Sequence, residues 1–138
     1  MSVFDFLQEH YLLVIGILLC LFFLLEEELS TYLSGKFRIE PEEVLNMQNK
    51  GAVVHDIRDK TSYDAGHISA AKHSFMDILQ DKPETMLDKK HKHILYCARG
   101  VKSCELASML RSKRGYEVYY LTGGLELWKE EGFTVTKR

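Results

Sequence analysis

ILYCARGVKS, residues 94–103, decides both the fold and the chemistry that we expect of this chain. The apolar residues up to Tyr96 predict a buried strand, and the small or apolar residues beyond Ser103 predict a helix. Cys97 then lies at the N-terminal end of that helix, where unpaired N–H groups and the helix dipole stabilise negative charge. Such a setting lowers the pKa of a thiol. We therefore expect Cys97 to be a nucleophile rather than an inert buried cysteine.

The residues that follow Cys97 predict a cradle for a bound anion. Arg99 and Lys102 add two positive charges, and Gly100 can adopt the positive φ that lets successive N–H groups point inward. We favour anion binding by Arg99 and Lys102 over a role as solvated surface charges. The predicted substrate-binding loop consists of Ala98, Arg99, Gly100, Val101, Lys102 and Ser103.

Short apolar stretches alternate with helical ones around this loop, which is typical of a parallel sheet with crossover helices. We expect strands at residues 52–57, 71–75, 93–96 and 118–121, and helices at residues 41–48, 61–65, 103–111 and 125–131. Residues 76–93 are more polar and predict only short helical turns around Pro83. Ligands bind outside the carboxyl ends of the strands in such sheets. Cys97 lies at that edge, and so do Asp56 and Arg58, which we expect to support the site through an ion pair.

An apolar run at residues 11–25 precedes this domain and predicts an N-terminal transmembrane helix. The run covers about 22 Å of a hydrocarbon core of roughly 30 Å, and Val3, Phe4, Phe6 and Leu7 can extend it. A secretory signal peptide is less favoured because no Lys or Arg precedes the run. A buried or dimerising helix is the other alternative.

The expected organisation is therefore an anchor at residues 1–30, a linker at residues 31–37 and an α/β domain at residues 38–138. Lys36 and Arg38 follow the apolar run, and the positive-inside rule then puts the domain in the cytoplasm. We expect a single-pass protein of the inner (cytoplasmic) membrane that contacts the lipid bilayer through residues 11–25.

The composition argues against several other classes of protein. The net charge of -2 disfavours a nucleic-acid-binding protein. Cys20, Cys97 and Cys104 have the spacing of neither a zinc site nor a disulfide framework. His91 and His93 lack a third ligand nearby, so we expect no metal and no cofactor. Cys104 is predicted to pack in the core rather than to act as a resolving thiol for Cys97.

Five short motifs are spread over the α/β domain: IEPEEV at residues 39–44, DIR at 56–58, GHI at 66–68, CARGVKS at 97–103, and LTGG at 121–124 with Trp128. Taken together, they resemble the rhodanese family of sulfurtransferases. The resemblance covers nearly all of residues 38–133, and with the apolar run the layout is similar to single-domain, membrane-anchored rhodaneses of bacteria. Departures from the family pattern at Ser69-Ala70, Lys102 and Thr134 bear on substrate preference more than on the reaction.

The resemblance implies a five-stranded parallel sheet flanked by helices, and a ping-pong reaction through a persulfide. Cys97 is the implied acceptor of the outer sulfur of thiosulfate or of another persulfide donor, and a small thiol, a protein thiol or cyanide then removes it. We expect the N–H groups of the loop to stabilise the anionic persulfide. His67 and Trp128 are expected to be structural.

Two other functions remain open. A phosphatase or arsenate reductase of the related type holds its oxyanion with an arginine placed after a cysteine and five residues, where this chain has Ser103. Without that arginine a phosphate loses a bidentate ligand. The second alternative is a non-catalytic, membrane-tethered binding module in which Cys97 is incidental. The presence of both Cys97 and Gly100 favours the transferase.

Overall fold

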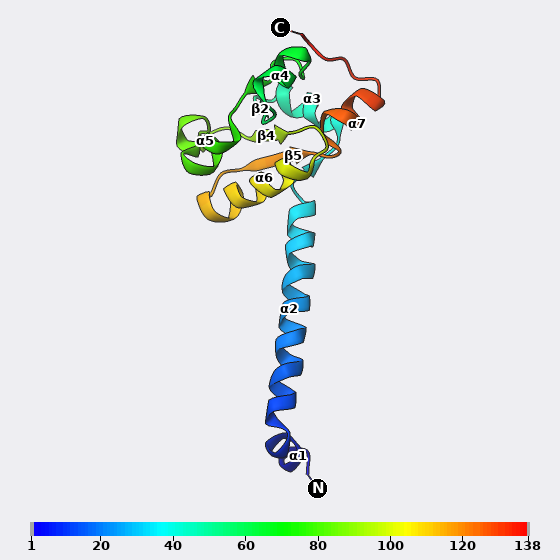
Figure 1. Ribbon diagram of the computed structural model, residues 1–138, viewed down its shortest axis with the longest axis vertical. Coiled ribbons are helices and arrows are strands. Elements are labelled where there is room, and N and C mark those ends of the chain that lie inside the picture. Colours follow the sequence, from blue (N-terminus) through cyan, green and yellow to red (C-terminus); the bar gives the residue numbers. More distant parts are fainter. Residues whose placement is uncertain (1, 138) are drawn as a thin grey trace. The chain divides into compact units, whose positions relative to one another are not determined.

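The computed structural model describes residues 2–137, which fall into two units that divide between Lys36 and Phe37. The first unit has two helices, α1 (Val3–Glu9) and α2 (Tyr11–Gly35). Ser2 caps α1: its hydroxyl accepts a hydrogen bond from the N–H of Asp5, whose carboxylate accepts one from the N–H of Ser2. The chain then breaks at His10, and Figure 1 shows α1 turned away from the axis of α2.

This break corrects the predicted transmembrane helix. Among residues 2–137, no helix combines the length and the apolar composition that crossing a bilayer requires. The break at His10 separates α1 from α2, so the apolar residues of α1 cannot lengthen the run at residues 11–25, and three glutamates follow the run within α2. We predicted a single-pass topology, a cytoplasmic domain and a contact with lipid from this span. The structure does not support these three predictions.

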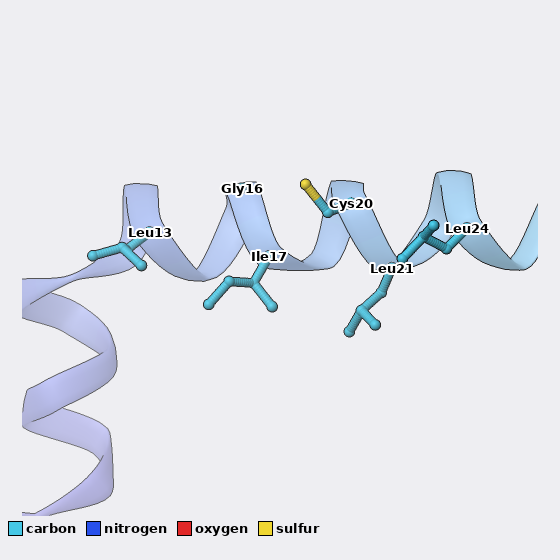
Figure 2. A pocket seen from close by; sticks show the side chains of 6 residues that line it. All are labelled: Leu13, Gly16, Ile17, Cys20, Leu21 and Leu24. Atoms are coloured by element: carbon cyan, nitrogen blue, oxygen red, sulfur yellow. The ribbon is translucent and has the colours of Figure 1, made fainter.

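Large apolar side chains on α2 are mostly exposed in the chain, among them Leu12, Leu18 and Phe23. A shallow groove on one face of α2 is lined by Leu13, Gly16, Ile17, Cys20, Leu21 and Leu24 (Figure 2). Cys20 is exposed there and has a free thiol. Residues 31–35, which we expected to belong to a linker, continue α2 instead, because no Pro or Gly interrupts the helix between residues 17 and 34.

The second unit is built on a five-stranded parallel sheet with the strand order β1-β5-β4-β2-β3. Its strands are β1 (Arg38–Ile39), β2 (Val53–Asp56), β3 (Lys72–His73), β4 (His93–Tyr96) and β5 (Val118–Leu121). The predicted α/β fold with five parallel strands is therefore confirmed. The position of β1 was not predicted, because two residues are too few to form a recognisable pattern.

Helices cover both faces of this sheet (Figure 1). They are α3 (Pro41–Asn49), α4 (Lys60–Ala65), α5 (Met76–Asp81), the 3-10 turn η1 (Pro83–Thr85), α6 (Val101–Arg114) and α7 (Gly124–Glu130). Neighbouring residues of β4 enter opposite cores. Ile94 shares one buried cluster with Val44 of α3 and Trp128 of α7, whereas Leu95 shares the other with Leu110 of α6. The expected short helical turns around Pro83 are α5 and η1.

Two buried histidines form a hydrogen-bonded chain between β2 and β4. Nε2 of His93 lies 2.8 Å from the carbonyl oxygen of Asp88 and 3.3 Å from the backbone nitrogen of the same residue. Nδ1 of His93 lies 3.0 Å from Nε2 of His55, and Nδ1 of His55 lies 2.8 Å from the Ser74 hydroxyl. Burial disfavours a positive charge on either ring and lowers the pKa of both. Burial, and then repulsion from a charged His93 and from Lys72, lower the pKa of His55 to about 3.

We expect the free energy of unfolding to fall as the pH drops below about 6.5, the ordinary pKa of histidine. The unfolded chain binds a proton at His55 in that range, whereas the folded protein does so only near its pKa of about 3. At a pH of about 5 this difference removes about 2 kcal/mol of stability. Urea unfolding at neutral pH and at this pH measures the loss. The free energy of unfolding of His55→Asn should fall less between the two pH values. An equal fall in this variant and in the unchanged protein contradicts the prediction.

Candidate active site

Cys97 directly follows β4 and lies at the carboxyl end of the sheet. It is buried, with 6% of the residue exposed. The N–H of Gly100 donates a hydrogen bond to Sγ at 3.0 Å, and the hydroxyl oxygen of Ser103 lies 3.5 Å from Sγ. Residues 98–103 therefore curl around the sulfur atom.

A glycine at position 100 makes this curl possible. Gly100 has a φ of +90° and is the N-cap of α6, so the helix begins at Val101, two residues earlier than predicted. A Cβ atom at this position would lie 3.0 Å from the backbone nitrogen of Gly123 and 3.3 Å from that of Gly124. The backbone conformation and the close approach both require glycine here.

The surroundings of Cys97 favour its thiolate. Burial by itself raises the pKa of Cys97, but hydrogen bonds from the Ser103 hydroxyl and from the N–H groups of Ser103, Gly100 and Arg99 outweigh it and leave the pKa lowered. The donors of the loop itself, rather than the charges of Arg99 and Lys102, are the main source of this effect.

Replacing Ser103 by alanine should slow the alkylation of Cys97 about fivefold near neutral pH, because a hydrogen bond to the thiolate worth about 1 kcal/mol is lost. Reaction with iodoacetamide over a series of pH values, followed at Cys97 by peptide mass mapping, measures this effect. Ser112→Ala, at an exposed position of the same helix, should react like the unchanged protein. An unaltered pH profile in Ser103→Ala contradicts the role given to the hydroxyl.

A cleft of about 430 Å³ opens beside Cys97. Its lining residues are Ile57, Arg58, Asp59, Ser62, Met76, Cys97, Ala98, Arg99, Val101 and Lys102. Three basic residues of this lining, Arg58, Arg99 and Lys102, outnumber its one carboxylate, that of Asp59. Met76 and Val101 supply apolar surface. This lining suits a small anion, with room for an attached apolar group.

Arg99 and Lys102 both line the cleft, and both are exposed. The side chain of Arg99 is 82% exposed, and its Nε lies 3.6 Å from Oε2 of Glu126. Such an exposed ion pair is weak. Arg99 can therefore exchange Glu126 for an anionic ligand at little energetic cost.

The fully buried Asp56 forms an ion pair at the end of β2 with Arg58, whose side chain is 13% exposed. Nη2 of Arg58 lies 2.7 Å from Oδ2 of Asp56, and the Nε and backbone N–H groups of Arg58 also donate to this carboxylate. Nη2 donates in addition to the carbonyl oxygen of Gly66 at 2.6 Å. Burial alone lowers the pKa of Arg58, but the interactions with Asp56 outweigh it and raise the pKa. The pair ties the end of β2 to the turn after α4 and holds the guanidinium in the wall of the cleft.

Four residues of the cleft wall were not predicted from the sequence. Ile57, Asp59 and Ser62 follow β2, and the rule that ligands bind at the carboxyl ends of strands could have found them. Met76 begins α5, in a stretch whose residue pattern is weak.

The remaining candidates lie outside the cleft. Nδ1 of His67 donates to the carbonyl oxygen of Tyr63 at 2.8 Å, and Trp128 is buried with its Nε1 donating to Thr134. Cys104 is half-buried on α6 against one of the two cores. Nowhere in residues 2–137 do three His, Cys, Asp or Glu side chains gather in a way that could hold a metal ion.

Comparison with known sequences identifies the family of this fold and site. The model of the rhodanese-like domain matches residues 40–131. The thiosulfate sulfurtransferase GlpE of Stutzerimonas stutzeri is 41% identical over 92 residues, which are 67% of this chain and 84% of that protein. The protein of the same name from Coxiella burnetii is 37% identical over 83 residues, which are 60% of this chain and 77% of that protein.

Solved structures agree with the sequence comparison. A rhodanese-related protein from Thermoplasma volcanium superposes with a TM-score of 0.66 at 25% identity, over 73% of this chain and 98% of that chain. A protein from Lactobacillus plantarum superposes with a TM-score of 0.63 at 27% identity, over 79% of this chain and 93% of that chain. With a family match over residues 40–131 and a shared sheet, this chain belongs to the rhodanese-like domain family.

Proposed function

We propose that residues 38–138 form a sulfurtransferase that moves a sulfane sulfur from thiosulfate, or from a persulfide donor, to a thiol or to cyanide. One observation carries the proposal: the buried sulfur of Cys97 accepts a hydrogen bond from the N–H of Gly100 beside a cleft of about 430 Å³. The name of the relatives, thiosulfate sulfurtransferase, supports the same reaction. The chain is a rhodanese-type enzyme.

The reaction has two steps that share one covalent intermediate. In the first, the Cys97 thiolate attacks the outer sulfur of thiosulfate, the S–S bond of thiosulfate breaks, and sulfite leaves with the electron pair. In the second, an acceptor thiolate or cyanide attacks the outer sulfur of the Cys97 persulfide and releases the thiolate. The acceptor leaves as a persulfide or as thiocyanate. Each step passes a sulfur between two nucleophiles, so neither step needs a cofactor.

The residues of the loop have separate roles in this proposal. The backbone N–H groups of residues 98–103 stabilise the thiolate and then the anionic persulfide. Lys102 and Arg58 attract the anionic donor into the cleft, and Arg99 joins them when it leaves Glu126. Ser103 donates its hydroxyl to the sulfur. Asp56 positions Arg58 and does not itself reach the sulfur.

Phosphate-ester or arsenate chemistry is a weaker candidate for this loop. The position that bears the phosphate-binding arginine in the related enzymes is occupied by Ser103, which is fully buried and turned to Cys97. A serine hydroxyl offers a single donor and no charge, whereas an arginine offers a fork of donors. A binding module without catalysis would have no use for a buried thiol whose pKa is lowered.

Initial rates with thiosulfate and cyanide varied together test the proposed function. A covalent intermediate predicts parallel lines in a double-reciprocal plot. Intersecting lines contradict a persulfide on the enzyme. Hydrolysis of an aryl phosphate at a higher rate than sulfur transfer supports the phosphatase instead.

A further inference from the structure

The turn that leads from β5 into α7 packs its backbone against the Cys97 loop. The N–H of Leu125 donates a hydrogen bond to the carbonyl oxygen of Cys97 at 2.9 Å, and the N–H of Glu126 donates to the carbonyl oxygen of Ala98 at 3.1 Å. Both donors belong to the first turn of α7, where N–H groups have no partner within the helix. The start of α7 therefore binds two successive carbonyls of the loop.

These two hydrogen bonds fix the direction of the loop amides. In a trans peptide the C=O and the following N–H point to opposite sides. When α7 holds the carbonyl of Ala98, the N–H of Arg99 must point away from α7. The N–H of Arg99 is one of the loop groups that lower the pKa of Cys97, beside the N–H of Gly100, which lies 3.0 Å from Sγ. The two sides of the same peptide thus connect α7 to the thiolate.

Glycine is required on both sides of this contact. A Cβ atom on Gly124 would lie 2.4 Å from the carbonyl oxygen of Cys97 and 2.7 Å from the carbonyl carbon of Ala98, and its φ is +61°. A Cβ atom on Gly100, from the opposite side, would lie 3.0 Å from the backbone nitrogen of Gly123. Any side chain at position 124 must push the Cys97 loop away.

We propose that Gly124, with the N–H groups of Leu125 and Glu126, is a positioning element that aims the loop amides at Cys97 and so sets the reactivity of its sulfur. The element touches neither donor nor acceptor and acts only through the backbone of residues 97–99. This role concerns only the thiolate of Cys97. It does not depend on which sulfur donor the proposed enzyme uses.

Gly124→Ala tests this inference by alkylation of Cys97 with iodoacetamide over a pH series. We expect alkylation near neutral pH to slow about tenfold and the midpoint of the pH profile to rise by about one unit, because at least one donor to the thiolate is misdirected. Gly132→Ala is the matched control, since Gly132 also has a positive φ, of +84°, but has open space around it. It bears the same kind of backbone strain without touching the loop. A Gly124→Ala profile that coincides with that of Gly132→Ala overturns the inference.

A second variant covers the possibility that Gly124→Ala does not fold. Glu126→Pro removes the N–H that binds the carbonyl of Ala98, and proline is tolerated in the first turn of a helix. Glu126→Ala keeps this N–H and removes only the carboxylate. We expect Glu126→Pro to slow the alkylation of Cys97 several-fold more than Glu126→Ala does, and equal rates in the two variants overturn the inference.

Alkylation and sulfur transfer separate the two proposals. If the pH profile shifts in Gly124→Ala but the unchanged protein transfers no sulfur, the positioning element stands and the proposed function fails. If the unchanged protein transfers sulfur and the profile does not shift, the function stands and the positioning element fails.

Discussion

Cys97→Ala should lower the rate of sulfur transfer from thiosulfate to cyanide by more than about a thousandfold, because it removes the atom that carries the sulfur between the two steps. The cleft and the loop amides remain in this variant, but they have no nucleophile to act on. Neither Cys20 nor Cys104 lines the cleft. The measurement is the initial rate of thiocyanate formation at saturating thiosulfate.

Cys104→Ala is the matched control for this prediction. Cys104 is also a free thiol, but it lies half-buried on α6 and packs against the core. The variant should keep most of the activity and lose a little stability. A Cys97→Ala variant that retains a substantial fraction of the rate would show that another group carries the sulfur. An equally inactive Cys104→Ala would instead give that thiol a part in the reaction.

Arg58→Ala should lower the free energy of unfolding by about 3–5 kcal/mol, because it leaves a buried carboxylate without its partner. Asp56 is fully buried, and Arg58 donates to it from Nε, from Nη2 and from its backbone N–H. Only the backbone donor survives the substitution. Urea unfolding at neutral pH gives the difference.

Lys60→Ala provides the comparison for Arg58→Ala. Lys60 pairs with Asp64 at 3.1 Å one helical turn away, but the two side chains are 45% and 43% exposed. Loss of such a pair costs less than about 1 kcal/mol. Comparable losses in the two variants contradict a structural role for the pair of Asp56 and Arg58.

The local parts of the site could be predicted from the sequence, because neighbouring residues determine them. A short apolar strand followed by a cysteine, a glycine and a helix requires the chain to turn sharply, and the positive φ of Gly100 is confirmed. The placement of Cys97 at the edge of the sheet follows from the general rule for parallel sheets. The start of α6 was misplaced by two residues, because Gly100 acts as the N-cap.

The contact between the loop and the start of α7 could not be predicted in this way. Gly124 and Cys97 are far apart in the sequence, and the contact joins backbone atoms whose positions depend on the pairing of β4 with β5. Hydrogen bonds between two loops leave no periodic pattern of apolar residues. Gly123 and Gly124 are recognisable in the sequence as part of a motif. Their contact with the Cys97 loop is visible only in the structure.

The N-terminal helix was misjudged for a different reason. A sum of hydropathy values adds the apolar residues on both sides of His10 as if they belonged to one helix. The capping box of Ser2 and Asp5 starts a short helix that ends before His10, and the apolar run then begins again at Tyr11. The capping residues are a local sign of this separate helix, and a sum of hydropathy values does not contain them.

The mass of the intact protein after brief exposure to thiosulfate shows whether Cys97 forms a persulfide. We expect that the protein gains one sulfur atom, that peptide mapping places it on Cys97, and that cyanide removes it. Cys97→Ala should gain none. A folded protein that gains no sulfur, or that carries it on Cys20 or Cys104 instead, contradicts a reaction through a persulfide on Cys97.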